Sequence, residues 1–493
     1  MKHRLTIHDG ATQRTVYIDE GKSLHSLLLA NGQFISSPCG GNGRCGKCKV
    51  TASGDFLSPY GCVSEPSELL ACKAYPAGDC EVFCKTLPRT VRRRSDGRTS
   101  SLGIAFDIGT TSISAVMCDL DTKEELAATT ERNAQCAYGA DIITRLTYDY
   151  KKLSDVLISQ INGIIQSLCD NPLSVSKITF AANTVMSHYI ARLSPEGLSR
   201  APFEPSDTFG KVYSAKELGI IARNADAFIF PSLASFVGGD ISAGIFALDI
   251  LSKEHPSLLL DVGTNGEAAL WKAGVLYVTS AAAGPAFEGA ELSCGMTAER
   301  GAVIAFDGKE FTTVDDSPPC GIAGSGAIDI LSELVKTGAV DKGGRLLPPD
   351  ETPAFSDRIS MRNDEVCFDI SNEVFLAASD IRKLQLAKAA IRAALSLLLK
   401  KSDTSLSEIG TFYLAGTFGS AIRTDAASDI GLIPEELTSV CKPSGNSALR
   451  GAVIALFEND ISDKLTQITN SVTHIELSGA SEFEDEFLKF IPM

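Results

Sequence analysis

The sequence predicts a small domain of mixed α and β structure, followed by a much larger two-lobed α/β domain. Three observations lead to this prediction. Four cysteines with ligand-like spacing gather near the N-terminus, an arginine-rich segment follows them, and the motif Asp-x-Gly-Thr occurs twice in the rest of the chain. The 493 residues provide enough chain for two to four domains with buried cores.

The expected N-terminal domain covers residues 1–88 and is rich in β structure. Residues 3–8 and 14–18 alternate between apolar and polar side chains around Asp9-Gly10, which is typical of a β-hairpin. A short helix and two further strands are expected at residues 22–31, 49–52 and 79–86.

The strongest motif of the chain is Cys39-x5-Cys45-x2-Cys48, with Cys72 downstream. Four converging thiolates suit an iron–sulfur cluster, and the glycines between them let backbone N–H groups approach its sulfides. The first interval is one residue longer than in plant-type ferredoxins, so the motif resembles the adrenodoxin-type variant of the β-grasp [2Fe–2S] ferredoxin fold. A zinc site is the alternative, but zinc knuckles usually pair two C-x2-C motifs. We therefore expect Cys39, Cys45, Cys48 and Cys72 to bind the cluster, with Cys62 as the competing fourth ligand.

Residues 89–101 separate this domain from the rest of the chain. The segment contains five arginines and hardly any apolar side chain, which is typical of a solvated linker. The alternative is a docking strip for an acidic partner. A mobile linker would suit a domain that has to swing in order to deliver electrons.

The charge of the chain limits its partners and its location. Residues 102–493 carry 31 basic and 52 acidic residues, and the whole chain has a net charge of −16. Such a surface repels phosphate backbones, so we expect no nucleic-acid partner. The N-terminus lacks the apolar core of a signal peptide, and no apolar run approaches the roughly 20 residues that span a bilayer. We therefore expect a cytoplasmic protein without membrane contact.

The larger domain contains two related segments, residues 103–118 and 257–270. Each consists of an apolar strand, the motif Asp-x-Gly-Thr and a second strand, and such a duplication predicts two similar lobes with a cleft between them. Asp107-Ile-Gly-Thr-Thr-Ser112 and Asp261-Val-Gly-Thr-Asn-Gly266 resemble the two phosphate loops of the actin/Hsp70/sugar-kinase superfamily, which has a ribonuclease H-like α/β fold. The two lobes are expected at residues 102–255 and 256–493.

This resemblance implies an ATPase domain and assigns roles to the two loops. Asp107 and Asp261 are expected to organise Mg²⁺ and the attacking water, because carboxylates hold hydrated Mg²⁺. Glycine lets the hairpin backbone approach the phosphates, and the neighbouring hydroxyl groups donate hydrogen bonds to them. The residues expected to hold the phosphates are Gly109, Thr110, Thr111, Gly263, Thr264 and Asn265.

Three later segments fit the same superfamily. Leu414-Ala-Gly-Thr-Phe-Gly419 resembles its adenosine motif, and residues 445–456 resemble the small-residue helix that connects the lobes. Gly321-Ile-Ala-Gly-Ser-Gly326 is expected to open a helix whose N–H groups bind an anion, with a simple glycine-rich cap as the alternative. Gly324, Gly416 and Gly419 are expected to contact adenosine or ribose. Further helices are expected at residues 151–169, 380–400 and 446–458.

A ferredoxin followed by such an ATPase resembles the reductive activators of corrinoid proteins. The segments that carry this resemblance, besides the motifs above, include Asn133-Ala-Gln135, Gly139-Ala-Asp141 with Arg145, Asn183–His188, Ala282–Gly289 and Asp380–Lys388. The resemblance implies an ATP-hydrolysing iron–sulfur reductase, in which ATP hydrolysis drives one-electron reduction of inactive Co(II) to Co(I) in a corrinoid protein of a methyltransferase system. It also implies an upstream electron donor and a homodimer formed through the ATPase domain. Some such activators carry a middle domain after the linker, which is expected to be missing here.

Other functions remain open from the sequence. The chain could activate another low-potential enzyme, act as a redox-sensing ATP-binding module, or phosphorylate a sugar. The roles of Cys62, Asn183, His188 and Glu288 are open as well. A capping or core role competes with a site role for Asn183 and His188, whereas Glu288 is a candidate cleft residue because buried carboxylates need a partner.

Overall fold

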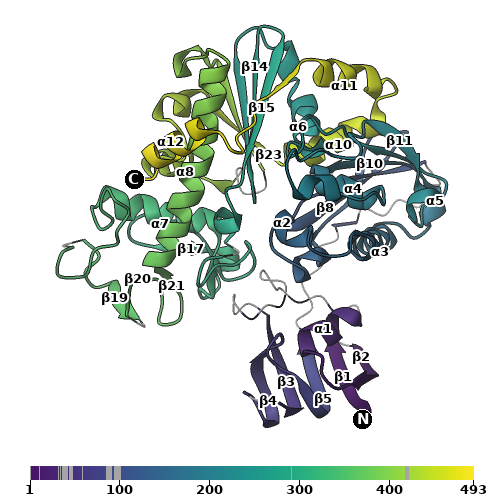
Figure 1. The fold of residues 1–493 in the computed structure, drawn as a ribbon, viewed down its shortest axis with the longest axis vertical. Coiled ribbons are helices and arrows are strands. Elements are labelled where there is room, and N and C mark those ends of the chain that lie inside the picture. The colour runs from purple at the N-terminus through teal and green to yellow at the C-terminus, as the bar shows by residue number, and fades with distance from the viewer. Residues whose placement is uncertain are drawn as a thin grey trace. The chain divides into compact units, whose positions relative to one another are not determined.

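The structure of the chain is a computed structural model (Figure 1). It describes residues 2–9, 12–31, 33, 35, 41, 43, 48–57, 59–84, 92–93, 101–289, 291–352, 354–362, 364–416 and 421–493. The chain divides into two compact units, and each is described by itself. The first unit comprises Met1–Ile178, His188–Ser206 and Tyr213–Ala227, and the second comprises Thr179–Ser187, Asp207–Val212 and Phe228–Met493.

The N-terminal domain is built on a five-stranded mixed sheet with the strand order β2-β1-β5-β3-β4 (Figure 1). β1 pairs antiparallel with β2 and parallel with β5, while β3 lies antiparallel between β5 and β4. This mixed sheet with one short helix has the predicted β-grasp arrangement. Its elements are β1 (Lys2–Asp9), β2 (Thr12–Asp19), α1 (Leu24–Ala30), β3 (Lys49–Phe56), β4 (Cys62–Leu70) and β5 (Pro76–Cys84).

One apolar core holds this domain together. Leu24, Leu27 and Leu28 of α1 are buried in the same cluster as Leu5 and Ile7 of β1. The predicted hairpin, the short helix and the two predicted strands are all confirmed. β4 was not predicted, because its sequence CVSEPSELL is mostly polar and largely exposed, so it lacks the apolar alternation that signals a strand.

The two larger sheets share one plan. The first has the strand order β11-β12-β10-β7-β8-β9-β6, and the second has the order β23-β22-β13-β14-β15-β24. In each sheet three consecutive strands form an antiparallel meander, β7-β8-β9 in the first and β13-β14-β15 in the second. Both meanders carry the Asp-x-Gly-Thr motif at their first turn, so the predicted duplication is present in the fold.

The strands of the first sheet lie within the predicted lobe 102–255 except β6, which lies in the predicted linker 89–101 and pairs antiparallel with β9. The first sheet contains β6 (Arg92–Arg93), β7 (Leu102–Ile108), β8 (Ser112–Asp119), β9 (Glu125–Arg132), β10 (Val175–Ala182), β11 (Lys211–Ser214) and β12 (Asp226–Ile229). The second contains β13 (Ser257–Val262), β14 (Gly266–Lys272), β15 (Val275–Ala281), β22 (Thr411–Ala415), β23 (Cys441–Gly445) and β24 (Val472–His474). Two small sheets consist of β16 (Ala302–Phe306), β17 (Phe311–Thr313) and β18 (Gly321–Ile322), and of β19 (Ile359–Arg362), β20 (Glu365–Asp369) and β21 (Phe375–Ala377).

The helices predicted at 151–169, 380–400 and 446–458 are confirmed, as α3, α8 and α10. Other helices lie between the strands. All of these helices have the bounds α2 (Ile142–Arg145), α3 (Tyr150–Leu168), α4 (Thr184–Ile190), α5 (Ala215–Leu218), α6 (Gly239–Leu248), α7 (Gly324–Lys336), α8 (Ala378–Lys401), α9 (Thr424–Asp429), α10 (Ser447–Phe457), α11 (Ile461–Asn470) and α12 (Ser481–Lys489). Within the described residues, no helix combines the length and the apolar character needed to cross a membrane.

Glycines allow α6 and α10 to cross at close range in the second unit. A Cβ atom on Gly451 of α10 would lie 2.1 Å from the carbonyl oxygen of Ala243 on α6. A Cβ on Gly244 of α6 would lie 2.8 Å from Oγ of Ser447. Any larger side chain at these positions would push the helices apart, which explains the small-residue character of residues 445–456.

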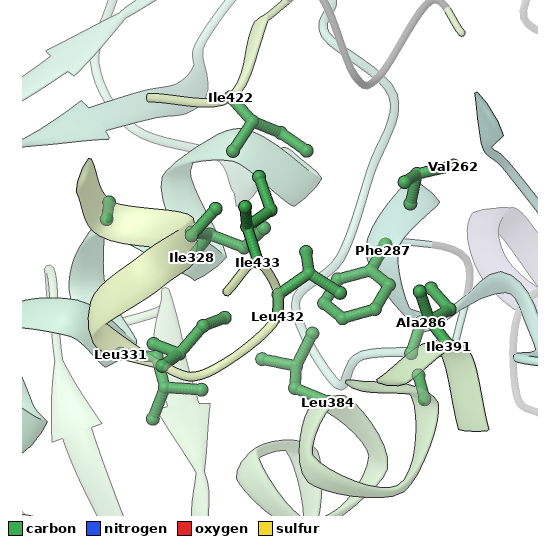
Figure 2. Packing of buried hydrophobic residues seen from close by; sticks show 14 of the residues in the cluster. Val262, Ala286, Phe287, Ile328, Leu331, Leu384, Ile391, Ile422, Leu432 and Ile433 are labelled. Atoms are coloured by element: carbon green, nitrogen blue, oxygen red, sulfur yellow. The ribbon is translucent and has the colours of Figure 1, made fainter. Parts of the chain in front are cut away.

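The second sheet packs against the long helix α8 over a continuous apolar core. Figure 2 shows Ile391 of α8 and Val262 at the end of β13 in this cluster, together with Phe287 of the short turn η5 (Pro285–Glu288). Gly266 at the start of β14 lies directly under α8, because a Cβ there would be 2.5 Å from Cγ1 of Ile391. This core fixes the second Asp-x-Gly-Thr turn and η5 in one rigid body.

Candidate functional site

Two of the four predicted cluster cysteines lie side by side in the N-terminal domain. Cys48 precedes β3 and Cys72 follows β4, and their Sγ atoms are 3.1 Å apart. Both side chains are buried and no disulfide joins them, since a disulfide would hold the sulfurs at about 2.05 Å. Two buried thiols at this distance fit a pair of ligands to one metal centre. Cys39 and Cys45 lie outside the described residues.

Cys62, the competing fourth ligand, lies at the opposite end of the β3–β4 ladder. The register pairs Lys49 with Leu70 beside Cys48 and Cys72, but pairs Asp55 with Cys62. Six residues along β3 correspond to roughly 20 Å at strand spacing. A hydrogen bond to Asp55 and the charge of Asp55 also raise the pKa of the Cys62 thiol, which disfavours the thiolate that a metal requires. The geometry therefore supports Cys72 as the partner of Cys48.

A buried histidine borders the cluster loop. Gly41 has a φ of +83°, and a Cβ atom on it would lie 2.8 Å from Nδ1 of His25, so only glycine fits at this position. His25 lies on α1, its N–H donates to the carbonyl oxygen of Ala71 at 2.9 Å, and burial lowers its pKa. His25 was not predicted as a site residue, because a single histidine in an apolar helix is usually a core residue.

The first Asp-x-Gly-Thr turn is closed by its own backbone and held by Asn133. The N–H of Gly109 donates to the carbonyl oxygen of Ser112 at 2.9 Å. Nδ2 of Asn133 donates to the carbonyl oxygen of Gly109 at 2.8 Å, and the N–H of Asn133 donates to that of Thr111, also at 2.8 Å. Asn133 is fully buried, so these bonds are shielded from water.

The third carbonyl of the turn, that of Thr110, has partners on the same side. Nη2 of Arg145 donates to this oxygen at 2.6 Å, and Sγ of Cys136 lies 3.7 Å from it. A trans peptide directs its C=O and the following N–H in opposite directions. The N–H of Thr110 therefore points away from Asn133, and the N–H of Thr111 points away from Arg145.

The second turn has a similar backbone but acidic neighbours. The N–H of Gly263 donates to the carbonyl oxygen of Asn265 at 2.9 Å, and Oγ1 of Thr264 donates to Oε2 of Glu288 at 3.1 Å. Glu288 thus lies at this loop, and its role as a cleft residue stays a prediction. It is carried by η5, which the apolar core joins to β13.

Gly416 of the predicted adenosine motif lies next to Asp261. The two positions follow from the parallel pairing of β13 and β22, in which Asp261 is the register partner of Ala415. Gly416 has a φ of +92°, and a Cβ on it would lie 2.7 Å from Oδ1 of Asp261. Gly419 lies outside the described residues.

Two further carboxyl groups accompany Asp261, and neither was predicted. Glu267 is the cross-strand partner of Asp261 on β14 and is buried. Burial, together with the charges of Asp240 and Asp261, raises the pKa of Glu267 well above its usual range. Burial likewise raises the pKa of Asp240, at the start of α6, to about 6. Sequence reasoning missed both because their proximity depends on strand register and helix packing.

Several other segments have structural roles. Oδ1 of Asn183 accepts a hydrogen bond from the N–H of Met186 at 3.0 Å, which caps α4, and His188 is fully buried in the same helix. Asp380 accepts hydrogen bonds from the N–H of Ser293 at 3.0 Å. Nζ of Lys388 donates to the carbonyl oxygen of Pro492 at 2.6 Å. The contact of Asn183 with Met186 and the burial of His188 favour a capping role for Asn183 and a core role for His188.

The glycine-rich segment 321–326 opens a helix, as predicted. α7 begins at Gly324, directly after the cap residue Ala323. A Cβ atom on Gly326 would lie 2.3 Å from the carbonyl oxygen of Val303, so close packing alone requires glycine there. Contact of Gly324 with a nucleotide stays a prediction.

Comparison with protein families matches three models along the chain. A 2Fe-2S iron–sulfur cluster binding domain matches residues 7–77, a model described as the RACo middle region matches residues 102–253, and the C-terminal ASKHA domain of RACo matches residues 255–492. The middle-region model coincides with the predicted first lobe, 102–255, and not with an additional domain between the linker and that lobe. Those residues contain the first Asp-x-Gly-Thr turn, and the sequence prediction had treated them only as an ATPase lobe.

Relatives with assigned names cover most of the chain. A corrinoid activation enzyme of Eubacterium limosum, RamQ, is 30% identical over 413 residues, which is 78% of this chain and 69% of that protein. A reductase of the Co(II) methylated amine-specific corrinoid protein of Methanosarcina barkeri is 24% identical over 446 residues, 78% of this chain and 76% of that protein.

A solved structure agrees with both sequence comparisons. A reductive activator for a corrinoid, iron–sulfur protein superposes with a TM-score of 0.74 at 25% identity, over 99% of this chain and 98% of that one. The N-terminal ferredoxin domain and the ASKHA domain of the actin/sugar-kinase type are therefore the fold of this protein. The chain belongs to the family of RACo-type corrinoid activators.

Proposed function

We propose that this chain reduces an inactive Co(II) corrinoid protein of a methyltransferase system to Co(I), one electron at a time, driven by ATP hydrolysis. The observation that carries the proposal is the pair of buried thiols, Cys48 and Cys72, in a chain that also folds two Asp-x-Gly-Thr hairpins. The names of the relatives supply the class of substrate. Electron transfer and nucleotide binding are thereby assigned to different domains of one molecule.

Cys39, Cys45, Cys48 and Cys72 would hold a [2Fe–2S] cluster. When bound, such a cluster supplies a one-electron carrier with a potential near about −400 mV for the plant type. The chain contributes a site that is half-formed by its own sheet, since β3 and β4 bring Cys48 and Cys72 together. It also contributes glycine at position 41, where any side chain would collide with His25.

The two hairpins would bind one MgATP. Asp107 and Asp261 would hold the hydrated Mg²⁺ and orient the attacking water. The remaining predicted contacts are those of Gly109, Thr110, Thr111, Gly263, Thr264 and Asn265 with the phosphates, and those of Gly324, Gly416 and Gly419 with adenosine or ribose. The position of Gly416 beside Asp261 supports a shared nucleotide site in the second unit.

The balance of the reaction is simple. One electron enters from an upstream low-potential donor and one electron leaves to cobalt, while ATP and water become ADP and phosphate. ATP is needed because the Co(II)/Co(I) couple of the substrate is expected to lie below the potential of the donor. We further propose a cytoplasmic location and a homodimer formed through the ATPase domain, as the family resemblance implies.

Visible spectroscopy under anaerobic conditions tests this proposal. A Co(II) corrinoid protein is mixed with the reduced full-length chain, with and without MgATP. We expect Co(I) absorbance only with MgATP, and no Co(I) with Cys45→Ser or Asp261→Ala. Cys62→Ser is the matched cysteine control and should behave like the wild type. Failure of every corrinoid protein tested, despite an intact cluster and bound ATP, would point to another low-potential acceptor.

A further inference from the structure

Arg145 is a fully buried arginine that stands directly behind the first Asp-x-Gly-Thr turn. Besides its bond to the carbonyl oxygen of Thr110, Nε donates to that of Gly139 at 2.9 Å and Nη1 donates to Oε1 of Gln135 at 3.4 Å. Nη2 also lies 3.4 Å from Sγ of Cys136. The guanidinium therefore joins the turn to the short segment that follows β9.

The charge of Arg145 is not neutralised by a hydrogen-bonded carboxylate. Each of its bonds in the described part of the chain goes to a carbonyl, an amide or a thiol. Asp141 is the nearby acid, but its oxygens accept from the N–H and the Oγ1 of Thr144, at 2.8 Å and 2.7 Å. Burial lowers the pKa of Arg145, yet a guanidinium keeps its proton in proteins.

The charge of Asp141 acts on Arg145 without a hydrogen bond, and a buried cation that lacks a hydrogen-bonded counter-ion is costly. A purely structural link could use a neutral side chain, because the acceptors of Arg145 are dipoles. The cost is offset if an anion binds on the other side of the same peptide. The peptide between Thr110 and Thr111 has the orientation that this requires, because its carbonyl accepts from Arg145 and its N–H points away from the guanidinium.

We propose that Arg145 is a positioning residue for nucleotide phosphates at the first turn. Its charge polarises the Thr110–Thr111 peptide and fixes the direction of that N–H, so the bound phosphate becomes the counter-charge of the buried guanidinium. This inference rests on the proposed ATP-binding function, and it assigns the ground-state attraction for phosphate mainly to the first turn. It predicts that the contribution of Arg145 grows with the negative charge of the ligand.

Binding of adenosine, MgADP and MgATP to the full-length chain tests the inference by calorimetry. We expect Arg145→Gln to leave the affinity for adenosine unchanged and to lower the affinity for MgATP about 10-fold to 100-fold, the range for a lost hydrogen bond to a charged group. The affinity for MgADP should fall by less than the affinity for MgATP. Arg145→Lys should recover part of the MgATP affinity. Arg192→Gln is the matched control, since Arg192 also bonds a carbonyl, that of Leu218, but pairs with Asp155.

A second variant covers the case in which Arg145→Gln does not fold. Gln135→Glu keeps the guanidinium and places a carboxylate beside it, so it should also weaken MgATP more than adenosine. An equal loss for all three ligands, or no loss for MgATP, in either folded variant would overturn the inference. The absence of nucleotide binding in the wild type would overturn the ATP proposal as well. Normal binding without corrinoid reduction would overturn only the proposed electron transfer.

Discussion

In both larger sheets an apolar strand ends in Asp-x-Gly-Thr and returns as its own antiparallel neighbour, yet the two turns have opposite electrostatic surroundings. Behind the first turn stand Arg145 and the amide of Asn133. Around the second stand the carboxyl groups of Glu267 and Glu288. The cross-strand partner of the motif aspartate differs accordingly, being Ser114 for Asp107 and Glu267 for Asp261.

The difference teaches that duplication of a hairpin does not duplicate its chemistry. The backbone plan comes from the strands, but the charge comes from side chains that differ between them: Arg145 of α2 in one case, and Glu267 of β14 with Glu288 of η5 in the other. A cationic support favours anion binding in the ground state. A carboxylate-rich support suits a hydrated cation or a proton transfer.

The largest expected effect is the loss of either motif aspartate. Asp107→Asn and Asp261→Asn should each lower ATP-dependent Co(I) formation by at least about a hundredfold, because both carboxylates are expected to act on one MgATP. Stopped-flow absorbance of the corrinoid measures the rate, and an unchanged cluster spectrum serves as the folding control. Full activity of one of these variants would separate the two turns and break the idea of a shared site.

The next effect concerns Glu288 at the second turn. Glu288→Gln should lower ATP turnover by roughly 10-fold to 100-fold, since a carboxylate at Thr264 can orient a cation-bound water or accept its proton. MgATP affinity should stay the same or increase, because a negative charge near the phosphates is removed. Phosphate release and calorimetry measure the two quantities. Weakened MgATP binding would contradict the proposed electrostatic difference between the two turns, since it would mean that Glu288, like Arg145, supports phosphate binding.

Two glycine substitutions, only one of them beside the second turn, distinguish the effect of a steric contact from the effect of backbone strain. Gly416→Ala should destabilise the chain by about 1–3 kcal/mol and weaken MgATP, because its Cβ would press on Oδ1 of Asp261. Gly274→Ala is the control: its φ of +89° is close to the +92° of Gly416, but no atom lies within 4 Å of its Cβ. Chemical denaturation and calorimetry measure both variants. Equal losses of MgATP affinity would show that strain alone explains the effect.

The smallest expected effect is a dependence of the free energy of unfolding on pH, caused by the carboxyl group of Asp240. The pKa of Asp240 rises from 3.8 to about 6 on folding. The folded chain therefore binds more protons in this window, and the free energy of unfolding should fall as the pH rises through it. Asp240→Asn lacks this loss and should be more stable than the wild type at pH 7, by on the order of 1 kcal/mol. Urea denaturation at pH 5 and pH 7 tests this, and a parallel loss in both proteins would contradict it.

The sequence predicted the parts of the molecule that depend on local pattern. The hairpins at Asp107 and Asp261 and helices α3, α8 and α10 follow from periodicity and spacing, whereas the family of the chain followed from the resemblance of its motifs. The choice of Cys72 over Cys62 gained support only from the β3–β4 register, which no local pattern encodes. Arg145 was recognised as part of a family segment, but its place behind Thr110 depends on a contact across 35 residues.

The pairing of β13 with β22 fixes the relative position of two predicted ligand contacts. One ladder of hydrogen bonds places Gly416 of the predicted adenosine motif directly beside Asp261 of the predicted phosphate loop. Their spacing cannot be adjusted without sliding a buried strand, which would turn every side chain of that strand to the other face. The junction between the predicted phosphate loop and the predicted adenosine motif would thus be set by the backbone of the sheet, and loop substitutions would alter it far less than a change of register.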